Sequence, residues 1–282
     1  MNGKVCDLHV HTYYSDSTFS PKEVIDTAKH AGLNAIAICD HDCVDGIPQC
    51  TKYANPAGIE IIPGIELTIE KNDEEIHILG YFIDWKARWL KSKLKEFQKS
   101  RIDRIYKMVD LLKKQGVDVD PREVFKLSGR GSVGRLHVAM VMLKGKKISH
   151  IQEAFNKYIG QSKPCYVKHL RFTPKEAIEM VIKAGGVPVL AHPSIMGKDE
   201  YITEFIEYGL RGIEVYHTDH NLGDENKYLN IAKKNNLIIT GGSDCHGLGK
   251  GRILIGKVKV PYSFLERLKE EADKIKMKNK KL

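Results

Sequence analysis

Residues 5–17 read VCDLHVHTYYSDS, an apolar run that turns into histidines and acidic residues within a few positions. The run from 5 to 10 is typical of a buried strand. In an extended chain alternate side chains share one face, so His9 and His11 can be directed at a single point. The sequence SPKE at 20–23 combines a capping box with proline at the first helical position, which predicts a helix. The segment therefore indicates a strand that carries two imidazoles and leads into a helix.

The same alternation of strand and helix extends outward from this segment along most of the chain. Apolar runs that predict further strands are found at 33–39, 59–65, 76–82, 187–191, 212–216 and 237–240. A second capping box, TPKE at 173–176, and helical patterns near 200–208, 224–235 and from 263 onward predict the helices that accompany them. Strands that alternate with helices form a parallel sheet with right-handed crossovers. We therefore predict an α/β fold of about seven strands, arranged as a barrel or as an open doubly wound sheet.

Helical periodicity replaces this alternation between about residues 86 and 163. One face of a long helix that ends near Gly116 can be lined by the apolar side chains of Leu94, Phe97, Ile105, Met108 and Leu112. Shorter helices are predicted from Asp120-Pro121 and at 149–159, with a glycine-rich loop between them. The predicted sheet is therefore interrupted once, by a helical insertion.

The composition of the 282 residues is that of an ordinary globular protein, with 42% hydrophobic and 29% charged residues. No stretch approaches the ~20 apolar residues of a membrane span, and the first eight residues lack the apolar core of a secretory signal. We therefore expect a cytoplasmic protein without membrane association. The formal net charge of +9 favours anionic partners. The six cysteines form no C-x-x-C pair, so reduced and mostly buried thiols are expected.

Side chains of the types that bind metals recur at or near the ends of nearly every predicted strand. Besides His9 and His11 they are Asp16, Asp40, His41, Glu66, His77, His192, His217, Asp244 and His246. The carboxyl edge of a parallel sheet is where active sites assemble in α/β folds. Imidazole and carboxylate together suit Zn, Mn or Fe ions, and buried ionisable groups must be paired or coordinated. The pattern therefore predicts a multinuclear metal centre at one edge of the sheet.

Several of these segments resemble the polymerase and histidinol phosphatase (PHP) superfamily. The matching motifs are DLHVHTYYSDS at 7–17, ICDHD at 38–42, PGIELT at 63–68, His77, AHPS at 191–194, EVYH at 214–217 and GGSDCHG at 241–247. The resemblance implies a distorted (β/α)7 barrel, similar to a TIM barrel, with three divalent ions (Mn, Fe or Zn) at the carboxyl ends of its strands. It also implies three parts: residues 1–86 and 166–282 as the two halves of the barrel, and 87–165 as a helical insertion that caps the substrate.

The same resemblance implies which side chains hold each ion. One ion takes His9, His11, Glu66 and Asp244. A second takes His77 and His192 and shares Glu66 as a bridge. A third takes Asp16, His41 and His246. Every one of these positions carries a residue of the expected ligand type.

The helical insertion resembles the PHP subfamily of nucleoside 3′,5′-bisphosphate phosphatases and a related 5′-to-3′ exoribonuclease. The resemblance rests on Arg101 and Arg104 in an Arg-x-x-Arg helix, and on Arg135 and His137 in a Gly-Arg-x-His-x-Ala element. Arginine gives phosphate oxygens bidentate hydrogen bonds, so these residues are candidate substrate contacts. The alternative for the first two arginines is a solvated helix face. His217, which follows a predicted strand at the site edge, is a candidate substrate contact or proton donor.

The resulting hypothesis is a metal-dependent phosphoesterase that hydrolyses phosphate monoesters of nucleotides by metal-activated water. Glu66, His217 and Arg135 are its candidate catalytic residues. Alternatives are a 5′-to-3′ exoribonuclease on short RNA, a histidinol-phosphate phosphatase, and a non-catalytic, metal-stabilised module that binds nucleic acid. The expected partner is a phosphorylated small molecule, in the first place a nucleotide. The sequence indicates no oligomeric state.

Overall fold

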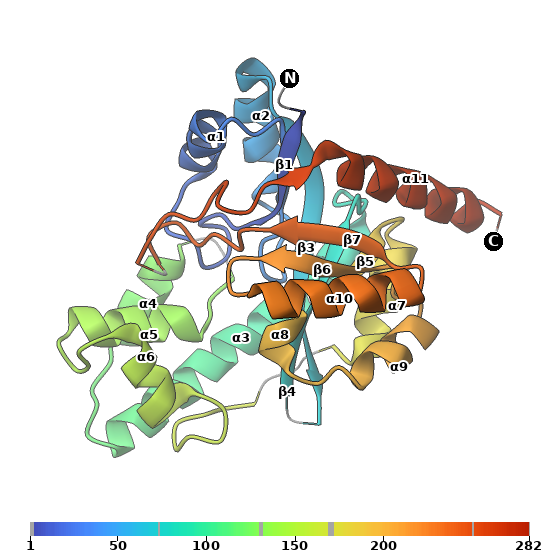
Figure 1. Cartoon of the computed structure of the whole chain (residues 1–282). Helices are drawn as coiled ribbons and strands as arrows, with labels where there is room; N and C mark the ends of the chain where they lie inside the picture. Colours follow the sequence, from blue (N-terminus) through green and yellow to red (C-terminus); the bar gives the residue numbers. More distant parts are fainter. Residues whose placement is uncertain (1–2, 73, 130–131, 169–171, 250, 282) are drawn as a thin grey trace.

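The computed structural model describes residues 3–72, 74–129, 132–168, 172–249 and 251–281. Its centre is a mixed sheet that curls into a nearly closed barrel, with helices packed around it (Figure 1). The strands are β1 (Val5–Val10), β2 (Ala35–Ile38), β3 (Glu60–Lys71), β4 (Glu74–Tyr81), β5 (Val187–Leu190), β6 (Gly212–His217), β7 (Ile238–Gly242) and β8 (Val260–Pro261). Their order in the sheet is β7-β6-β5-β4-β3-β2-β1-β8. The predicted barrel of the PHP type is thereby confirmed.

The helices that accompany the barrel strands are α1 (Pro21–His30), α2 (Ile47–Ala57), α7 (Pro174–Lys183), α8 (Pro193–Met196), α9 (Tyr201–Glu207), α10 (Leu222–Lys234) and α11 (Tyr262–Asn279). Both predicted capping boxes are present, at the start of α1 and of α7. Helix α2 was not predicted, because the glycine and two prolines in and before it also indicate a loop. Proline at its first turn is nevertheless compatible with a helix start.

The barrel closes where the ends of β1 and β7 meet. The N–H of Asp244 donates to the carbonyl of His9 over 2.8 Å, and the N–H of His11 donates to the carbonyl of Cys245 over 3.2 Å. Glycine at position 242 makes this approach possible, because a Cβ there would lie 2.3 Å from the backbone nitrogen of His9. The closure brings the first and last ligand segments of the chain together.

Strand β4 runs antiparallel to both of its neighbours, so the prediction of a fully parallel sheet was wrong at this strand. Only positions 72 and 73 separate the end of β3 at Lys71 from the start of β4 at Glu74, and a parallel crossover needs a dozen residues or more. As a consequence, Glu66 and His77 lie within the two strands of a long hairpin and not at carboxyl strand ends. Strand β8 is also antiparallel to its partner, β1.

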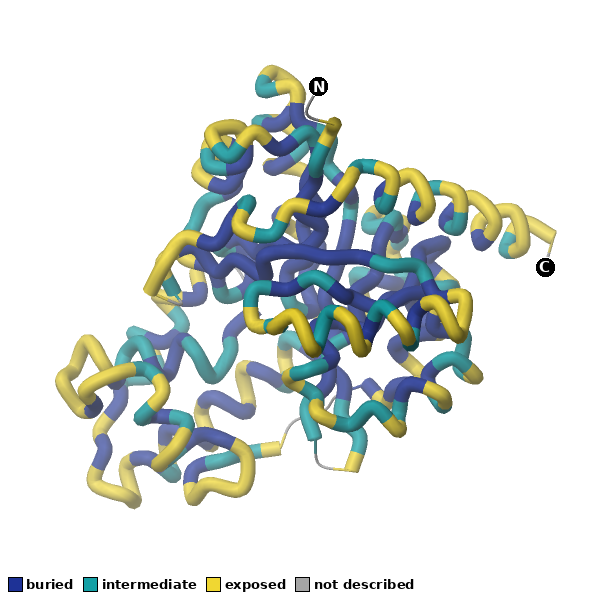
Figure 2. Tube along the Cα trace, viewed as in Figure 1, coloured by how far each residue is buried: buried dark blue, intermediate teal, exposed yellow. Residues whose placement is uncertain are grey.

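The helical insertion consists of α3 (Arg88–Lys114), α4 (Pro121–Ser128), α5 (Arg135–Lys144), α6 (Ile151–Ala154) and the π-helical turn η1 (Phe155–Ile159), which lie together on one side of the barrel (Figure 1). Helix α3 has the predicted apolar face, and this face serves two cores. Leu94 and Phe97 pack in the main core of the barrel, whereas Ile105, Met108 and Leu112 pack in a separate core within the insertion. Figure 2 shows buried segments in both regions.

All six cysteines are buried and form no disulfide, as predicted. Burial raises the pKa of the Cys6 thiol to about 12, which keeps this side chain protonated and unreactive at neutral pH. Among the residues that the structure describes, no helix combines the length and the apolar character needed to span a bilayer.

Candidate metal centre

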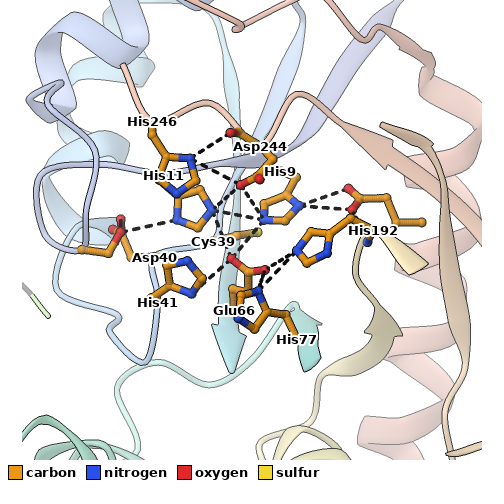
Figure 3. A network of polar contacts seen from close by, with 12 residues as sticks. His9, His11, Cys39, Asp40, His41, Glu66, His77, His192, Asp244 and His246 are labelled. Carbon is orange, nitrogen blue, oxygen red and sulfur yellow. Dashed lines mark hydrogen bonds and ion pairs between the residues drawn. The ribbon is translucent and has the colours of Figure 1, made fainter. Parts of the chain in front are cut away.

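Nine side chains predicted as metal ligands come together at one end of the barrel. They are His9, His11, Asp16, His41, Glu66, His77, His192, Asp244 and His246, and all except Asp16 are labelled in Figure 3. Three of them lie within strands β1, β3 and β4, and the others follow β1, β2, β5 and β7. Because strands hold the backbone rigidly, the site is fixed by the barrel itself.

One oxygen of Glu66 faces the first group of candidate ligands. Its Oε2 lies 3.2 Å from Nε2 of His9, 3.1 Å from Nε2 of His11 and 3.3 Å from Nδ1 of His41. Oδ1 of Asp244 completes the group, 2.9 Å from Nε2 of His11 and 3.5 Å from Nε2 of His9. His9, His11, Glu66 and Asp244 therefore converge on one point, which His41 approaches from the end of β2.

The other oxygen of Glu66 faces a second group. Its Oε1 lies 2.9 Å from Nδ1 of His77 and 3.0 Å from Nε2 of His192, and these two nitrogens are 3.3 Å apart. Glu66 thus lies between the two groups, with one oxygen directed at each. This is the geometry that a bridging carboxylate requires.

A third group surrounds Asp16. Its Oδ1 lies 3.1 Å from Nε2 of His246, and its Oδ2 lies 3.8 Å from Nε2 of His41. Nδ1 of His11 is 3.9 Å from Oδ1 of Asp16. Because His41 directs Nδ1 at Glu66 and Nε2 at Asp16, its ring connects this group with the first one.

Buried atoms without hydrogen bonds show that the donor set fits metal ions. Among the described residues, Oε2 of Glu66, Nδ1 of His41 and Oδ1 of Asp16 are buried and take part in no hydrogen bond. Leaving such groups uncompensated is costly. Bonds of about 2.0–2.2 Å from a cation to imidazole nitrogen and carboxylate oxygen would place the ligand atoms about 3 Å apart, as they are here. Nitrogen and oxygen donors in this mixture suit Zn, Mn or Fe.

One buried carboxylate behind the ligands, Glu214, was missed as a site residue in the sequence. Glu214 in β6 lies 3.1 Å from Nδ1 of His9 and accepts the backbone N–H of His192 over 2.9 Å. A carboxylate behind a ligand histidine fixes the ring and leaves Nε2 free for a metal. The signal was present, since a carboxylate within the apolar strand GIEVYH needs a buried partner. Asp40 accepts three hydrogen bonds of 2.7 Å from Thr12 and Ser15, which hold the loop that carries Asp16.

His217 lies at the edge of the same cluster. Its Nδ1 accepts the backbone N–H of Asp219 over 3.1 Å, so the neutral ring carries its proton on Nε2. This Nε2 lies 3.6 Å from Oδ2 of Asp244. Burial alone would lower the pKa of His217, but the carboxylates of Asp244 and Glu214 outweigh it and raise the pKa. The position and the tautomer are compatible with the predicted role of proton donor.

Metal binding is expected to release protons at pH 7. Burial would lower the pKa of His11 and His77, but Glu66 and neighbouring carboxylates raise it to about 9 and about 10. Both rings are therefore protonated in the metal-free protein, and a metal ligand must be neutral. Because the pKa of His9 is raised as well, we expect at least two protons to leave the ligand histidines at pH 7, and metal affinity to increase with pH up to about 10. Titration calorimetry of Mn²⁺ binding in buffers of different ionisation enthalpy measures the number, and a buffer-independent heat would contradict the prediction.

The same two pKa values determine how the stability of the metal-free protein depends on pH. A raised histidine pKa stabilises the folded state fully below the unfolded value of about 6.5, and this contribution is lost as pH rises through the folded pKa. His11 and His77 therefore contribute stability at pH 6 that is lost between pH 7 and 10.

Two adjoining cavities lie between the cluster and the helical insertion. The larger has a volume of about 730 Å³ and is bounded by candidate ligands on one side and by apolar side chains on the other: Leu136, Leu143, Ile151, Phe155 and Ile195. The smaller has a volume of about 190 Å³ and is lined by Arg101, Arg104 and Arg135 together with Asp16, His41 and His77. Arginines and candidate ligands therefore share one cavity.

Arg101 and Arg104 are buried, so the alternative of a solvated helix face was wrong for both. Nε of Arg101 donates to Asp42 over 2.9 Å, and its Nη2 donates to Thr68 over 2.7 Å. Nε of Arg104 donates to the carbonyl of Val167 over 2.6 Å. The two arginines thus connect α3 through hydrogen bonds to the segments that carry these partners, and they also line the smaller cavity.

Arg135 and His137 lie at the start of α5. Nη2 of Arg135 donates to Oε2 of Glu75 over 2.7 Å, and its guanidinium lies 5.7 Å from the ring centre of Phe155. His137 is buried and its Nδ1 accepts the backbone N–H of Gly134 over 3.0 Å, so it caps the helix. Arg135 therefore lines the smaller cavity, whereas His137 caps the start of the helix that carries Arg135.

The fold and the site define a class: an α/β-barrel hydrolase built around a buried centre of imidazoles and carboxylates. The PHP domain model matches residues 7–180, more than half of the chain. The chain belongs to the PHP domain family, and it is a metal-dependent phosphoesterase of that family.

Three known proteins are similar over almost their whole length. A 3′,5′-nucleoside bisphosphate phosphatase from Chromobacterium violaceum is 30% identical over 251 residues, which cover 87% of this chain and 88% of that protein. A 5′-3′ exoribonuclease from Haemophilus influenzae is 31% identical over 266 residues, which cover 90% of this chain and 97% of that protein. The solved structure of a Bifidobacterium adolescentis protein described as a metal-dependent phosphoesterase has a TM-score of 0.87 and 28% identity, covering 94% of this chain and 96% of that one.

Proposed function

We propose that this phosphoesterase removes one phosphate from nucleotides that carry two, such as a nucleoside 3′,5′-bisphosphate. The observation that carries the proposal is the pair of adjoining cavities beside one cluster of candidate ligands, one lined by arginines and the other by apolar side chains. A substrate with a scissile phosphate, a second phosphate and a nucleoside matches the cluster and both cavities. The relative from Chromobacterium violaceum is named for this activity.

The smaller cavity suits a phosphate group. Arginine offers several N–H donors in a plane that matches phosphate oxygens, and three arginines line this cavity. The larger cavity suits a nucleoside, because ligand sites are largely apolar with a few polar groups that fix orientation. Phe155 and Leu136 line both cavities and so lie where the two meet.

In this proposal the nine side chains of the centre hold divalent ions in the three groups described above. Bound ions of this kind supply a hydroxide at neutral pH and neutralise charge on the phosphoryl oxygens. Glu66 keeps the first two groups at a fixed separation through its two oxygens. Arg135 contacts the non-bridging oxygens, and Nε2–H of His217 donates a proton to the leaving oxygen. The helical insertion, residues 87–165, acts as the substrate cap.

Cleavage of short RNA from its 5′ end is the second candidate function. The relative from Haemophilus influenzae is a 5′-3′ exoribonuclease, and the net charge of +9 favours a polyanion. Histidinol phosphate fits less well, because it carries one phosphate and a cationic amine that the three arginines would repel. A purely nucleic-acid-binding module would not need a buried centre that opens into a cavity.

The test is phosphate release by Mn-loaded protein from adenosine 3′,5′-bisphosphate, compared with a short 5′-phosphorylated RNA and with histidinol phosphate. We expect release from the bisphosphate that stops when a chelator removes the metal. Shortening of the RNA by the same preparation would add the exonuclease function. Release from histidinol phosphate alone, or from none of the three with metal bound, would refute the proposed substrate class.

Replacing Arg135 with alanine is expected to raise KM for the bisphosphate about 10- to 100-fold, because a hydrogen bond to a charged group contributes about 1.5–3 kcal/mol. The kcat value is expected to fall as well, because in the proposed mechanism Arg135 also contacts the non-bridging oxygens as their charge develops. Steady-state kinetics measures both values. Arg122→Ala is the control, because that arginine is exposed on α4 and pairs with Asp120. Equal KM values for the two variants would remove Arg135 from the substrate site.

A further inference from the structure

A carboxylate of the β3–β4 hairpin lies between the metal centre and the helical insertion. Glu75 of β4 directs Oε1 toward Nε2 of His77, 3.4 Å away, and Oε2 toward Nη2 of Arg135, 2.7 Å away. The side chain also lines the smaller cavity. One carboxylate thus contacts a candidate metal ligand and the candidate phosphate-binding arginine, which are 58 positions apart in the chain.

The contact with His77 repeats an arrangement found elsewhere in the centre. Nδ1 of His77 faces Glu66 at 2.9 Å, and its opposite nitrogen faces Glu75. His9 has the same pattern, with Nε2 facing Glu66 and Nδ1 facing Glu214. An outer carboxylate of this kind fixes the orientation of a ligand histidine and strengthens metal binding. The 3.4 Å separation is slightly longer than an optimal N–H···O hydrogen bond.

The second contact of Glu75, with Arg135, holds the arginine side chain in position. The guanidinium carbon of Arg135 lies 5.7 Å from the ring centres of both Phe155 and Tyr166. Its Nη2 contacts Glu75. The Arg135 and Glu75 side chains are 16% and 25% exposed, so their ion pair is shielded in part from solvent. The pair therefore joins α5 of the insertion to β4 of the barrel beside the smaller cavity.

We propose that Glu75 is a positioning residue with two functions: it orients His77 for metal binding and holds Arg135 in place for the substrate phosphate. The second function rests on the proposed function, whereas the first requires only that the centre binds metal. Because the two contacts use different oxygens, they can be separated experimentally.

The first measurement is Mn²⁺ affinity without substrate, by competition with a chelating dye. Glu75→Ala is expected to lower the affinity about 10- to 100-fold. Glu74→Gln is the matched control, because Glu74 is the preceding residue of the same strand and its contact is Lys198, 3.8 Å away. The melting temperature of each variant shows whether it is folded. An affinity of Glu75→Ala within two-fold of the control would overturn the role toward His77.

The second measurement is the affinity for inorganic phosphate at saturating Mn²⁺, in wild-type protein, Glu75→Ala, Arg135→Ala and the double variant. If Glu75 holds Arg135, removing the arginine weakens phosphate binding in the wild-type background and has little further effect in the Glu75→Ala background. Equal effects of Arg135→Ala in both backgrounds would overturn this role. Neither measurement uses a nucleotide, so failure of the proposed substrate leaves both results interpretable.

Glu75→Gln separates the two functions of Glu75 most clearly, because the substitution keeps the size of the side chain but leaves one acceptor oxygen instead of two. The amide can accept a hydrogen bond from His77 or from Arg135, but not from each through a separate oxygen. We expect this variant to retain either the metal affinity or the dependence of phosphate binding on Arg135, and to lose the other. Retention of both would overturn the two-function assignment.

Discussion

Glu66→Gln is expected to abolish phosphoesterase activity and metal loading together. Its two oxygens lie within 3.3 Å of five imidazole nitrogens that belong to His9, His11, His41, His77 and His192. The amide offers one neutral oxygen and an NH₂ group that repels cations, so two groups of ligands lose their shared anion. We expect kcat/KM to fall at least about 1,000-fold, which corresponds to about 4 kcal/mol.

Elemental analysis of the purified variant and a phosphate-release assay measure the two effects. Glu70→Gln is the matched control, because Glu70 lies on the same strand, four residues toward the hairpin tip, 3.9 Å from Lys168. The control should keep its metal and its activity. Full activity in Glu66→Gln would show that the bridging assignment is wrong.

Gly242→Ala is expected to disrupt the closure of the barrel and the centre with it. The added Cβ would lie 2.3 Å from the backbone nitrogen and 2.4 Å from Cβ of His9, and neither atom can move without shifting β1. Overpacking of this kind costs about 3 kcal/mol, which corresponds to a decrease in melting temperature of about 6–12 °C. Because His9 and Asp244 flank the contact, metal affinity should fall as well.

Thermal unfolding with and without Mn²⁺ tests this prediction. Gly3→Ala is the control, since a Cβ at position 3 would meet no atom within 4 Å. We expect the control to unfold at the wild-type temperature. An alanine at 242 that leaves both melting temperature and metal affinity unchanged would mean that β1 and β7 do not approach each other as closely as described.

Much of the centre was predictable because the signal is local. A strand buried on both faces is almost wholly apolar, so a histidine or carboxylate at its end stands out, as in LHVH at 8–11 and GSDCH at 242–246. Short apolar runs located the strands for the same reason. The assignment of side chains to three groups came from the family resemblance, and the distances around Glu66 are compatible with it.

The parts that escaped prediction depend on contacts between distant residues. The direction of β4 follows from the turn at Asn72, whose φ of 51° suits asparagine, but apolar runs alone do not reveal strand direction. The ion pair between Arg101 and Asp42 and that between Arg135 and Glu75 join residues about 60 positions apart. The family resemblance placed Arg101 in a helix and Arg135 in a Gly-Arg-x-His-x-Ala element, but it did not show which carboxylate each arginine contacts.

The most direct measurement of the central claim is anomalous diffraction from crystals of the Mn-loaded protein, recorded near the manganese absorption edge. The account predicts anomalous peaks within bonding distance of both oxygens of Glu66, one toward His9 and His11 and one toward His77 and His192. A further peak is expected beside Asp16. Absence of anomalous density at Glu66, in crystals whose protein is shown to contain manganese, would contradict the proposed centre and the mechanism built on it.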